Sequence, residues 1–301
     1  MLNSRPRLVV AIIGPTGIGK TRFAIDLAIK YNGEIVNADS RQVYRFMDIG
    51  TAKPTKEQFK LVPHHLFDIV DPDEDFSLAQ YQTLTCQAIR DIHQRGRLPL
   101  LVGGTGQYIW AVLEGWVVPA VPPDMEYRRF LEQQAADGKS ADLYAALQKS
   151  DPDVAEKIDP HNIRRVIRAM EIIQKTDKPF SAQRLKKPPS FDFRVIGLTM
   201  ERQALYARVD ARVDDMVKQG FIDEVKHLTA KGYSLELPSM SGIGYREIGR
   251  YLHDEMTLEE AVGKIKNGTH RFIRHQYAWF KKSDSRIEWF DLSQENLEFS
   301  I

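Results

Sequence analysis

The stretch from Gly14 to Thr21 constrains the fold of this chain more than any other. It reads Gly, four residues, then Gly-Lys-Thr, between the apolar run 8–13 and the helix-compatible stretch 22–31. That strand, loop and helix context is the one that a phosphate-binding P-loop requires. A glycine-rich turn that merely joins a strand to a helix is the alternative. We expect a diphosphate or polyphosphate to be bound by Gly14, Pro15, Thr16, Gly17, Ile18, Gly19, Lys20 and Thr21.

The physical basis of this prediction lies in the residue types. Glycines allow successive backbone N–H groups to turn toward an anion, and a helix N-terminus adds partial positive charge. Lys20 supplies a full charge, and the Thr21 hydroxyl can hold Mg²⁺. The motif identifies the anion but not the reaction.

Short apolar runs alternate with amphipathic stretches along the chain. This pattern predicts a P-loop NTPase-like α/β fold, with a mostly parallel sheet flanked by helices. The predicted strands are 8–14, 34–40, 64–70, 98–104, 194–200 and 286–292. From 119 to 189 only helix-like segments occur, bounded by prolines. We therefore expect residues 1–119 and 190–301 to form an α/β core with C-terminal helices, and residues 120–189 to form a helical insertion domain.

Composition limits the class of protein. The 301 residues carry a net charge of +1, so any nucleic-acid partner must be bound by local patches. The single cysteine, Cys86, excludes an internal disulfide and favours a reducing compartment. No apolar run is long enough for a membrane span, and the N-terminal residues lead directly into a predicted strand. We expect a cytoplasmic monomer without membrane contact.

Polar residues follow the predicted strands at the edge where the P-loop lies. In an open parallel sheet, ligands bind outside the carboxyl ends of the strands. Asp39 follows the second strand and is a candidate general base, an Mg²⁺ ligand through water, or a helix cap. Thr105 lies in a glycine-rich turn after the fourth strand, where an NTP-hydrolysing protein often has an acid. Asp71 is a second acidic candidate, and the histidines 64 and 65 favour strand packing over metal binding.

Two regions are basic against the neutral average. Residues 161–189 hold eight Lys and Arg, among them Arg164 and Arg168, which share one face of a predicted helix. Residues 264–282 hold six more with no acid, interleaved with aromatic side chains that suit base stacking. Solvated helix faces over core stripes are the alternative for both, but two such patches beside a diphosphate site favour nucleic-acid binding.

These residues resemble a known family, the tRNA dimethylallyltransferases, also called tRNA isopentenyltransferases. The resemblance spans nearly the whole chain, and its motifs together are far more specific than the P-loop alone. They are Gly-Pro-Thr at 14–16 with Gly19-Lys20-Thr21, Asp39-Ser40 with Gln42-Val43-Tyr44, residues 48–54, Gly103-Gly104-Thr105-Gly106 with Tyr108, residues 165–171, Gly244-Tyr245-Arg246-Glu247, and Gln276 with Trp279-Phe280. The chain departs from the family pattern at Gly17-Ile18, Arg164 and His270.

The resemblance implies a reaction. A dimethylallyl group passes from dimethylallyl diphosphate to the exocyclic amine (N6) of the adenosine just 3′ of the tRNA anticodon, and diphosphate leaves. The developing charge on the diphosphate needs stabilisation by Lys20, the P-loop amides and Mg²⁺. By resemblance Asp39 is the base, Thr105 is catalytic, and Arg208 is the further basic residue at the diphosphate, with Arg212 one helical turn on as the alternative.

The resemblance also implies contacts with the anticodon stem-loop, because a stacked base must be flipped out to reach a recessed site. The implied tRNA contacts are Asp39, Ser40, Arg41, Gln42, Thr105, Arg128, Arg164, Arg165, Val166, Ile167 and Arg168. Three rivals stay open at this point: a transferase acting on free adenine nucleotides, an ATP-dependent small-molecule kinase, and a non-catalytic RNA-binding protein with a vestigial P-loop. Whether ATP binds is also open.

Overall fold

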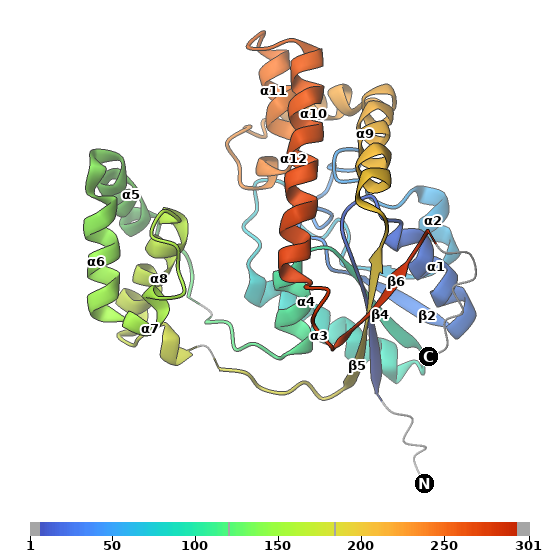
Figure 1. Ribbon diagram of the computed structural model, residues 1–301, viewed down its shortest axis with the longest axis horizontal. Coiled ribbons are helices and arrows are strands. Elements are labelled where there is room, and N and C mark those ends of the chain that lie inside the picture. Colours follow the sequence, from blue (N-terminus) through green and yellow to red (C-terminus); the bar gives the residue numbers. More distant parts are fainter. Residues whose placement is uncertain (1–6, 120, 184, 294–301) are drawn as a thin grey trace. The chain divides into compact units, whose positions relative to one another are not determined.

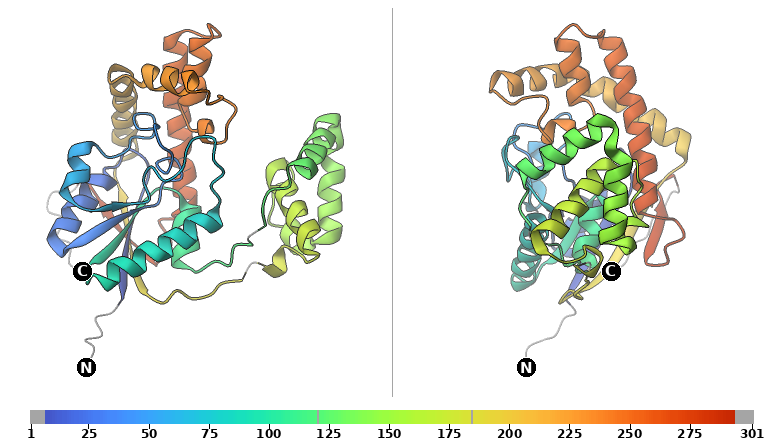
Figure 2. Two further views of the ribbon diagram at one scale, coloured as in Figure 1. Left: turned by 180° about the vertical axis from the view of Figure 1, so that it is seen from behind. Right: turned by 90° about the vertical axis from the view of Figure 1, so that its left-hand side faces the viewer.

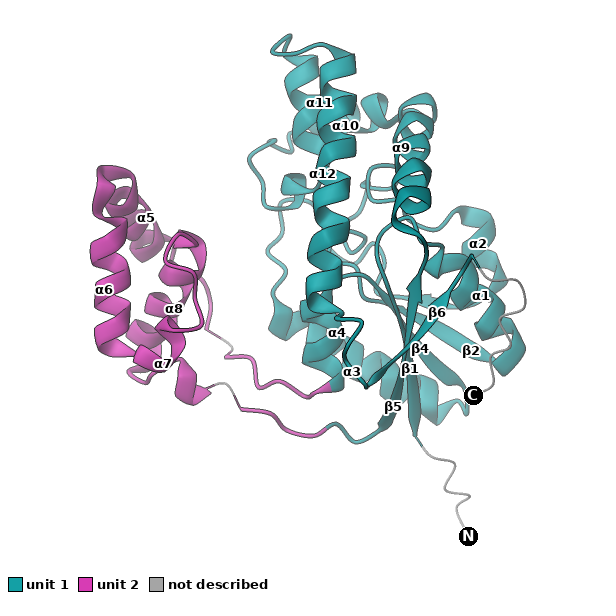
Figure 3. Cartoon of the chain, in the orientation of Figure 1, with its two compact units in different colours: residues 1–113, 189–301 teal, residues 114–188 magenta. Residues whose placement is uncertain are grey.

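The computed structural model describes residues 7–119, 121–183 and 185–293 and divides them between two compact units. One unit comprises residues 1–113 and 189–301, and the other comprises residues 114–188, which are coloured separately in Figure 3. Each unit is described by itself. Within the described residues, no helix combines the length and the apolar character that a membrane crossing requires.

The first unit is built on a sheet of six parallel strands (Figure 1). They are β1 (Leu8–Ile13), β2 (Gly33–Asn37), β3 (His64–His65), β4 (Leu98–Gly103), β5 (Asp192–Thr199) and β6 (Ile287–Asp291). The strand order is β3-β2-β4-β1-β5-β6. The central strands are buried almost throughout, which explains their nearly continuous apolar sequences. The α/β prediction with a mostly parallel sheet is confirmed.

Helices follow the strands of this unit. They are α1 (Lys20–Tyr31), α2 (Lys56–Leu61), α3 (Leu78–Gln94), α4 (Gly106–Leu113), α9 (Arg202–Lys218), α10 (Phe221–Ala230), α11 (Tyr245–Leu252) and α12 (Leu258–Trp279), with a 3₁₀ turn at Ser239–Ser241. Val10 and Ile12 of β1 share one core cluster with residues of α1, α9 and α12. The long helix α12 packs along α9 and α11, as both Figure 1 and Figure 2 show.

The second unit is helical, with a core of its own. Its elements are α5 (Met125–Gln134), a π-helical turn at Ala135–Lys139, α6 (Ser140–Ser150), α7 (Pro152–Ala155), α8 (Ile163–Thr176) and a 3₁₀ turn at Ser181–Gln183. Leu131, Leu147 and Val166 are among the buried residues of its core. A single antiparallel bridge joins Trp116 to Lys186, where the chain enters and leaves the unit.

The structure differs from the sequence-based prediction at the third strand. The predicted strand 64–70 is reduced to two residues, because Leu66 and Asp68 adopt positive φ angles that end the ladder. After β5 the chain forms two helices, α9 and α10, which Gly220 separates at φ 102°. That backbone conformation suits glycine and ends the first helix.

Candidate active site

One cavity of about 1000 Å³ in the first unit brings together residues from the carboxyl ends of β1 and β2 and from α9. Nine of the residues predicted to bind or act on the two substrates line this cavity. They are Thr16, Gly17, Gly19, Lys20, Thr21, Asp39, Gln42, Arg208 and Arg212. Ser40, Arg41 and Thr105 are not part of the lining. Ser40 and Arg41 follow Asp39 in the chain, and Thr105 accepts a hydrogen bond from the Ser40 N–H. The P-loop and Asp39 therefore face one common space, as ligand binding at the strand ends requires.

The P-loop has the backbone geometry of an anion site. Gly14, Gly17 and Gly19 take φ angles of 144°, 78° and 106°. A side chain at Gly14 would place its Cβ 2.6 Å from the Leu198 carbonyl oxygen, so the loop approaches β5 too closely for any other residue. Helix α1 begins at Lys20 without a side-chain cap, which leaves the amides of its first turn available to an anion.

Lys20 is folded onto its own loop. Its Nζ donates to the carbonyl oxygens of Gly14 (2.9 Å) and Pro15 (2.8 Å). Burial lowers the pKa of Lys20 to about 8, while the charge of Asp39 raises this pKa and that of Arg212 lowers it. A bound diphosphate would stabilise the charged form of this ammonium.

Two arginines of α9 complete the cationic side of the cavity. The Arg208 guanidinium lies over Gly19, where its Nη1 is 3.5 Å from the Ile18 carbonyl oxygen. Arg212 is more deeply buried, and this burial lowers the pKa of its guanidinium, against the opposite influence of Asp39. Both candidates for the additional basic residue therefore lie at the P-loop, and the choice between them stays a prediction.

The turn after β2 orients Asp39. The Asn37 side chain accepts a hydrogen bond from the Asp39 N–H and donates to the Asp39 carbonyl oxygen. The Arg41 N–H donates to Asp39 Oδ1 at 2.9 Å. Ser40 N–H donates to Thr105 Oγ1 at 3.0 Å, which joins this turn to the turn after β4. One Asp39 oxygen is thereby fixed by the backbone, and within the described residues Oδ2 takes no hydrogen bond.

The Arg41 side chain is engaged inside the protein. Its guanidinium donates to the carbonyl oxygens of Pro238 and Ser239 and to Ser241 Oγ. These hydrogen bonds hold the Arg41 side chain against the segment 238–241, and its contact with tRNA stays a prediction.

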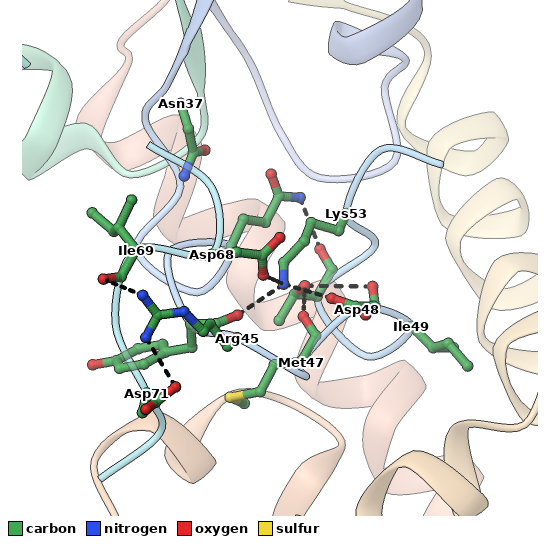
Figure 4. A network of polar contacts seen from close by, with 12 residues as sticks. Asn37, Arg45, Met47, Asp48, Ile49, Lys53, Asp68, Ile69 and Asp71 are labelled. Atoms are coloured by element: carbon green, nitrogen blue, oxygen red, sulfur yellow. Dashed lines mark hydrogen bonds and ion pairs between the residues drawn. The ribbon is translucent and has the colours of Figure 1, made fainter. Parts of the chain in front are cut away.

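The segment 48–54 forms a further wall of the cavity and is held by a buried lysine. Lys53 Nζ donates to the Tyr44 carbonyl oxygen (2.8 Å), to Asp48 (2.6 Å) and to Asp68 (2.5 Å), and its side chain is 3% exposed (Figure 4). Gln42 Nε2 donates to the carbonyl oxygens of Thr51 and Ala52. The Gln42 amide is thus oriented with its donor group bound to the protein.

Gln276 of α12 joins the two halves of the site. Its Oε1 accepts from the Thr16 N–H at 2.8 Å, and its Nε2 donates to the Gly104 carbonyl oxygen at 3.1 Å. The side chain is 2% exposed, so these two bonds satisfy a buried amide. The P-loop and the turn that carries Thr105 are therefore held together by one side chain from the C-terminal helix.

In the second unit, the predicted tRNA contacts divide into two groups. Arg164 and Arg165 are exposed at the start of α8. Val166 and Ile167 lie in the core at 0% and 3% exposure, so their predicted RNA contact is corrected: their side chains are covered.

Arg128 and Arg168 both bind the buried Glu171. Arg128 makes two bonds of 2.9 Å with it, and Arg168 pairs with it and donates to the Val121 carbonyl oxygen. Burial alone would raise the pKa of Glu171, but hydrogen bonds from Arg128, the Asp124 N–H and Arg168 outweigh it and lower this pKa. Arg128 and Arg168 therefore stabilise the unit itself, and their contact with tRNA stays a prediction.

The remaining candidates have structural roles. Asp71 accepts from Arg45 at 3.0 Å and does not line the cavity. His65 binds Glu34 at 2.6 Å, whereas His64 packs against the rings of Phe59 and Phe67. Within 7–119, 121–183 and 185–293, no group of three or more His, Cys, Asp or Glu side chains could hold a metal. Arg184, one of the eight basic residues of region 161–189, lies outside the described residues.

The second basic region lies along α12 and beyond. Lys266 pairs with Asp214, and Arg274 donates to the Tyr206 hydroxyl. Two of the basic side chains in this region therefore have partners within the protein. Phe272 and Trp279 remain 37% and 40% exposed, whereas Phe280 is buried. Base stacking by the two exposed rings stays a prediction.

Sequence reasoning missed the contacts of Lys53 and Glu224. Lys53 was part of a family motif without a role, although an acid five residues before it gave a local signal. Glu224 gave none, because the backbone N–H groups that it binds lie more than 170 residues away in the chain.

Comparison with known proteins agrees with this geometry. Residues 42–283 match a family model described as IPP transferase, and residues 7–66 match one described as isopentenyl transferase. The chain is similar to the tRNA dimethylallyltransferases of Roseiflexus sp. (strain RS-1), at 56% identity over 91% of this chain and 90% of the relative, and of Dehalococcoides mccartyi, at 47% over 97% and 90%.

Solved structures of similar proteins point the same way. The tRNA isopentenylpyrophosphate transferase from Bacillus halodurans is 45% identical, with a TM-score of 0.69 over 95% of this chain and 90% of that one. A eukaryotic dimethylallyltransferase acting on tRNA is 32% identical, with a TM-score of 0.81 over 95% and 75%. The chain therefore belongs to the IPP transferase family, and its activity is the prenylation of tRNA.

Proposed function

We propose that the chain transfers a dimethylallyl group from dimethylallyl diphosphate to N6 of the adenosine 3′-adjacent to the anticodon. The observation that carries this proposal is the convergence of Lys20, Thr21, Asp39 and Arg208 on one cavity. A cationic loop faces a carboxylate there, which suits departure of an anion on one side and loss of a proton on the other.

The leaving group is the diphosphate. As the bond between C1 of the dimethylallyl group and oxygen breaks, the electron pair goes to the diphosphate oxygen and the carbon becomes cation-like. The P-loop amides, Lys20 and Arg208 are placed to stabilise this negative charge. No acid after β4 is required, because no water has to be activated.

The acceptor amine must lose a proton as the new bond from N6 to C1 forms. The amine is a weak nucleophile because its lone pair is delocalised into the ring. Asp39 Oδ2 is the base that takes this proton, since Oδ1 is held by the Arg41 N–H. Gln42 and the Ser40 and Thr105 hydroxyls lie beside it as polar groups for the flipped nucleotide.

Mg²⁺ fits this site. Magnesium in proteins keeps several waters and takes one or two protein oxygens together with substrate phosphate oxygens. Thr21 and Asp39 both line the cavity, where the Thr21 hydroxyl would supply one oxygen and Asp39 would hold the ion through water. When bound, the ion neutralises part of the charge on the diphosphate.

The exposed Arg164 and Arg165 are the proposed tRNA contacts of the second unit. Their side chains form no ion pair within the described residues, which leaves their charge to phosphate groups. We also propose that the enzyme acts on its tRNA substrate in the cytoplasm, as a monomer.

The test is transfer of labelled dimethylallyl from its diphosphate, with Mg²⁺, into an unmodified anticodon stem-loop. AMP and a stem-loop lacking the target adenosine are assayed in parallel. Label only in the intact stem-loop supports the proposal, whereas label in AMP would assign the chain to the enzymes that modify free nucleotides. Asp39→Ala should abolish transfer while the stem-loop still binds, and a near-normal rate would remove Asp39 as the base.

A further inference from the structure

Glu224 of α10 is the acceptor for three consecutive backbone amides. Its carboxylate takes hydrogen bonds from the N–H groups of Asp48 (2.9 Å), Ile49 (2.6 Å) and Gly50 (3.1 Å). Successive amides that converge in this way form a concave anion site, and here the anion belongs to the protein itself. Hydrogen bonds that N–H groups donate to a charged carboxylate are stronger than those between two neutral groups. The Glu224 carboxylate therefore fixes the backbone of this segment.

The same carboxylate is fixed from its other side. The Tyr245 hydroxyl, on α11, donates to Glu224 Oε1 at 2.7 Å. Gly50 lies directly against Tyr245 and Phe221: a Cβ at this position would come within 2.7 Å and 2.3 Å of their rings. Helices α10 and α11 therefore determine where residues 48–50 lie.

The fixed segment continues into the cavity wall. Asp48, Ile49, Thr51 and Ala52 all line the cavity, although Glu224 does not. The carbonyl oxygens of Thr51 and Ala52 hold Gln42 Nε2 at 3.0 and 3.1 Å. Gln42 Oε1 takes no hydrogen bond within the described residues, so the orientation of this free acceptor depends on where residues 51 and 52 lie.

We propose that Glu224 is a positioning residue for the acceptor substrate. It acts through residues 48–52 on Gln42, and Gln42 Oε1 accepts a hydrogen bond from the RNA. This inference rests on the proposed function, because it assigns Gln42 to the acceptor side of the cavity. Among the residues that the structure describes, the P-loop and α9, which form the diphosphate side, have no hydrogen bond to Glu224.

The main test is Glu224→Gln, which keeps the shape of the side chain but replaces one acceptor oxygen by a donor facing backbone N–H groups. We expect the KM for the anticodon stem-loop to rise about tenfold, and the KM for dimethylallyl diphosphate to change less than about twofold. The matched control is Asp223→Asn, an exposed acid on the same helix, which should leave both values unchanged. Equal effects on the two KM values would overturn the proposal.

A double-mutant cycle separates positioning from general loss of structure. In a Gln42→Ala background, Glu224→Gln should have little further effect on the KM for the stem-loop, because the group that it positions is gone. A full additive effect would show that Glu224 does not act through Gln42. Tyr245→Phe removes one hydrogen bond to Glu224 and should give a smaller rise in the same KM, so it serves if Glu224→Gln fails to fold. The wild-type transfer assay is run first, and its failure would refute the proposed function rather than this inference.

Discussion

Gln276 and Thr16 are 260 positions apart in the chain, yet the Thr16 N–H donates to Gln276 Oε1 at 2.8 Å. The same side-chain amide donates to the Gly104 carbonyl oxygen.

Gln276→Glu should keep the hydrogen bond from the Thr16 N–H and lose the one to Gly104, because a carboxylate cannot donate. We expect this buried substitution to cost about 2 kcal/mol in the free energy of unfolding and to lower kcat, measured by thermal denaturation and by transfer assays. The exposed Gln203→Glu on α9 is the control, and equal behaviour of the two variants would contradict this role.

Lys20 should make diphosphate binding depend on pH. Its pKa of about 8 in the free protein, caused first by burial, means that the ammonium loses its proton above that pH. Because diphosphate stabilises the charged form, its binding slightly above pH 8 should take up a proton, which calorimetry in buffers of different ionisation enthalpy measures. Lys20→Met should remove this uptake, and an unchanged uptake would assign the proton elsewhere.

Lys20 should make the free protein more stable as pH rises. A lysine whose pKa is raised by an acidic partner has the opposite effect. The unfolded chain binds this proton up to its ordinary pKa of 10.5, whereas the folded chain releases it near 8. The contribution of Lys20 to the free energy of unfolding therefore rises with pH between these two values. Denaturant titrations across that range, with and without Lys20→Met, measure the difference.

Glu171 should make the helical unit sensitive to acid. Its pKa is lowered in the folded state, so its contribution to stability is present above the unfolded pKa and is lost as pH falls through the folded value. Glu171→Gln should flatten this acid dependence and cost about 3 kcal/mol, because it leaves two arginines without their buried partner. Hydrogen exchange of the α8 amides reports the effect, and Glu126→Gln on exposed α5 surface should leave the exchange rates unchanged.

The salt dependence of stem-loop binding should distinguish the exposed arginines of this unit from those that pair with Glu171. Arg165→Met should reduce the slope of log affinity for the stem-loop against log salt by about one, since one phosphate contact is lost. Arg128→Met should instead lower the melting temperature, because it breaks the pair with Glu171. A normal salt slope in Arg165→Met would mean that this side chain does not touch phosphate.

The sequence was sufficient for features that depend on local pattern. Apolar runs predicted the positions of the six strands, although only two residues of the predicted strand 64–70 form one. The spacing of Gly14, Lys20 and Thr21 predicted the phosphate loop. It was insufficient where tertiary contacts decide. The same helical periodicity that places Arg168 on a polar face cannot show that Glu171, three residues on, is buried and binds it. The hydrogen bonds of Gln276 and Glu224 likewise join segments that are far apart in the chain, so no local pattern predicts them.

The pairing of β1 with β5 has a consequence for how the chain is made. β1 leaves the ribosome early, but its partner β5 follows only after residues 114–188, so one side of the central strand stays uncovered during that interval. The core of the inserted unit, by contrast, is built from one continuous stretch of chain and is complete once that stretch has emerged. The sheet can therefore be completed only after the inserted helices have emerged, because β5 and β6 follow them in the chain.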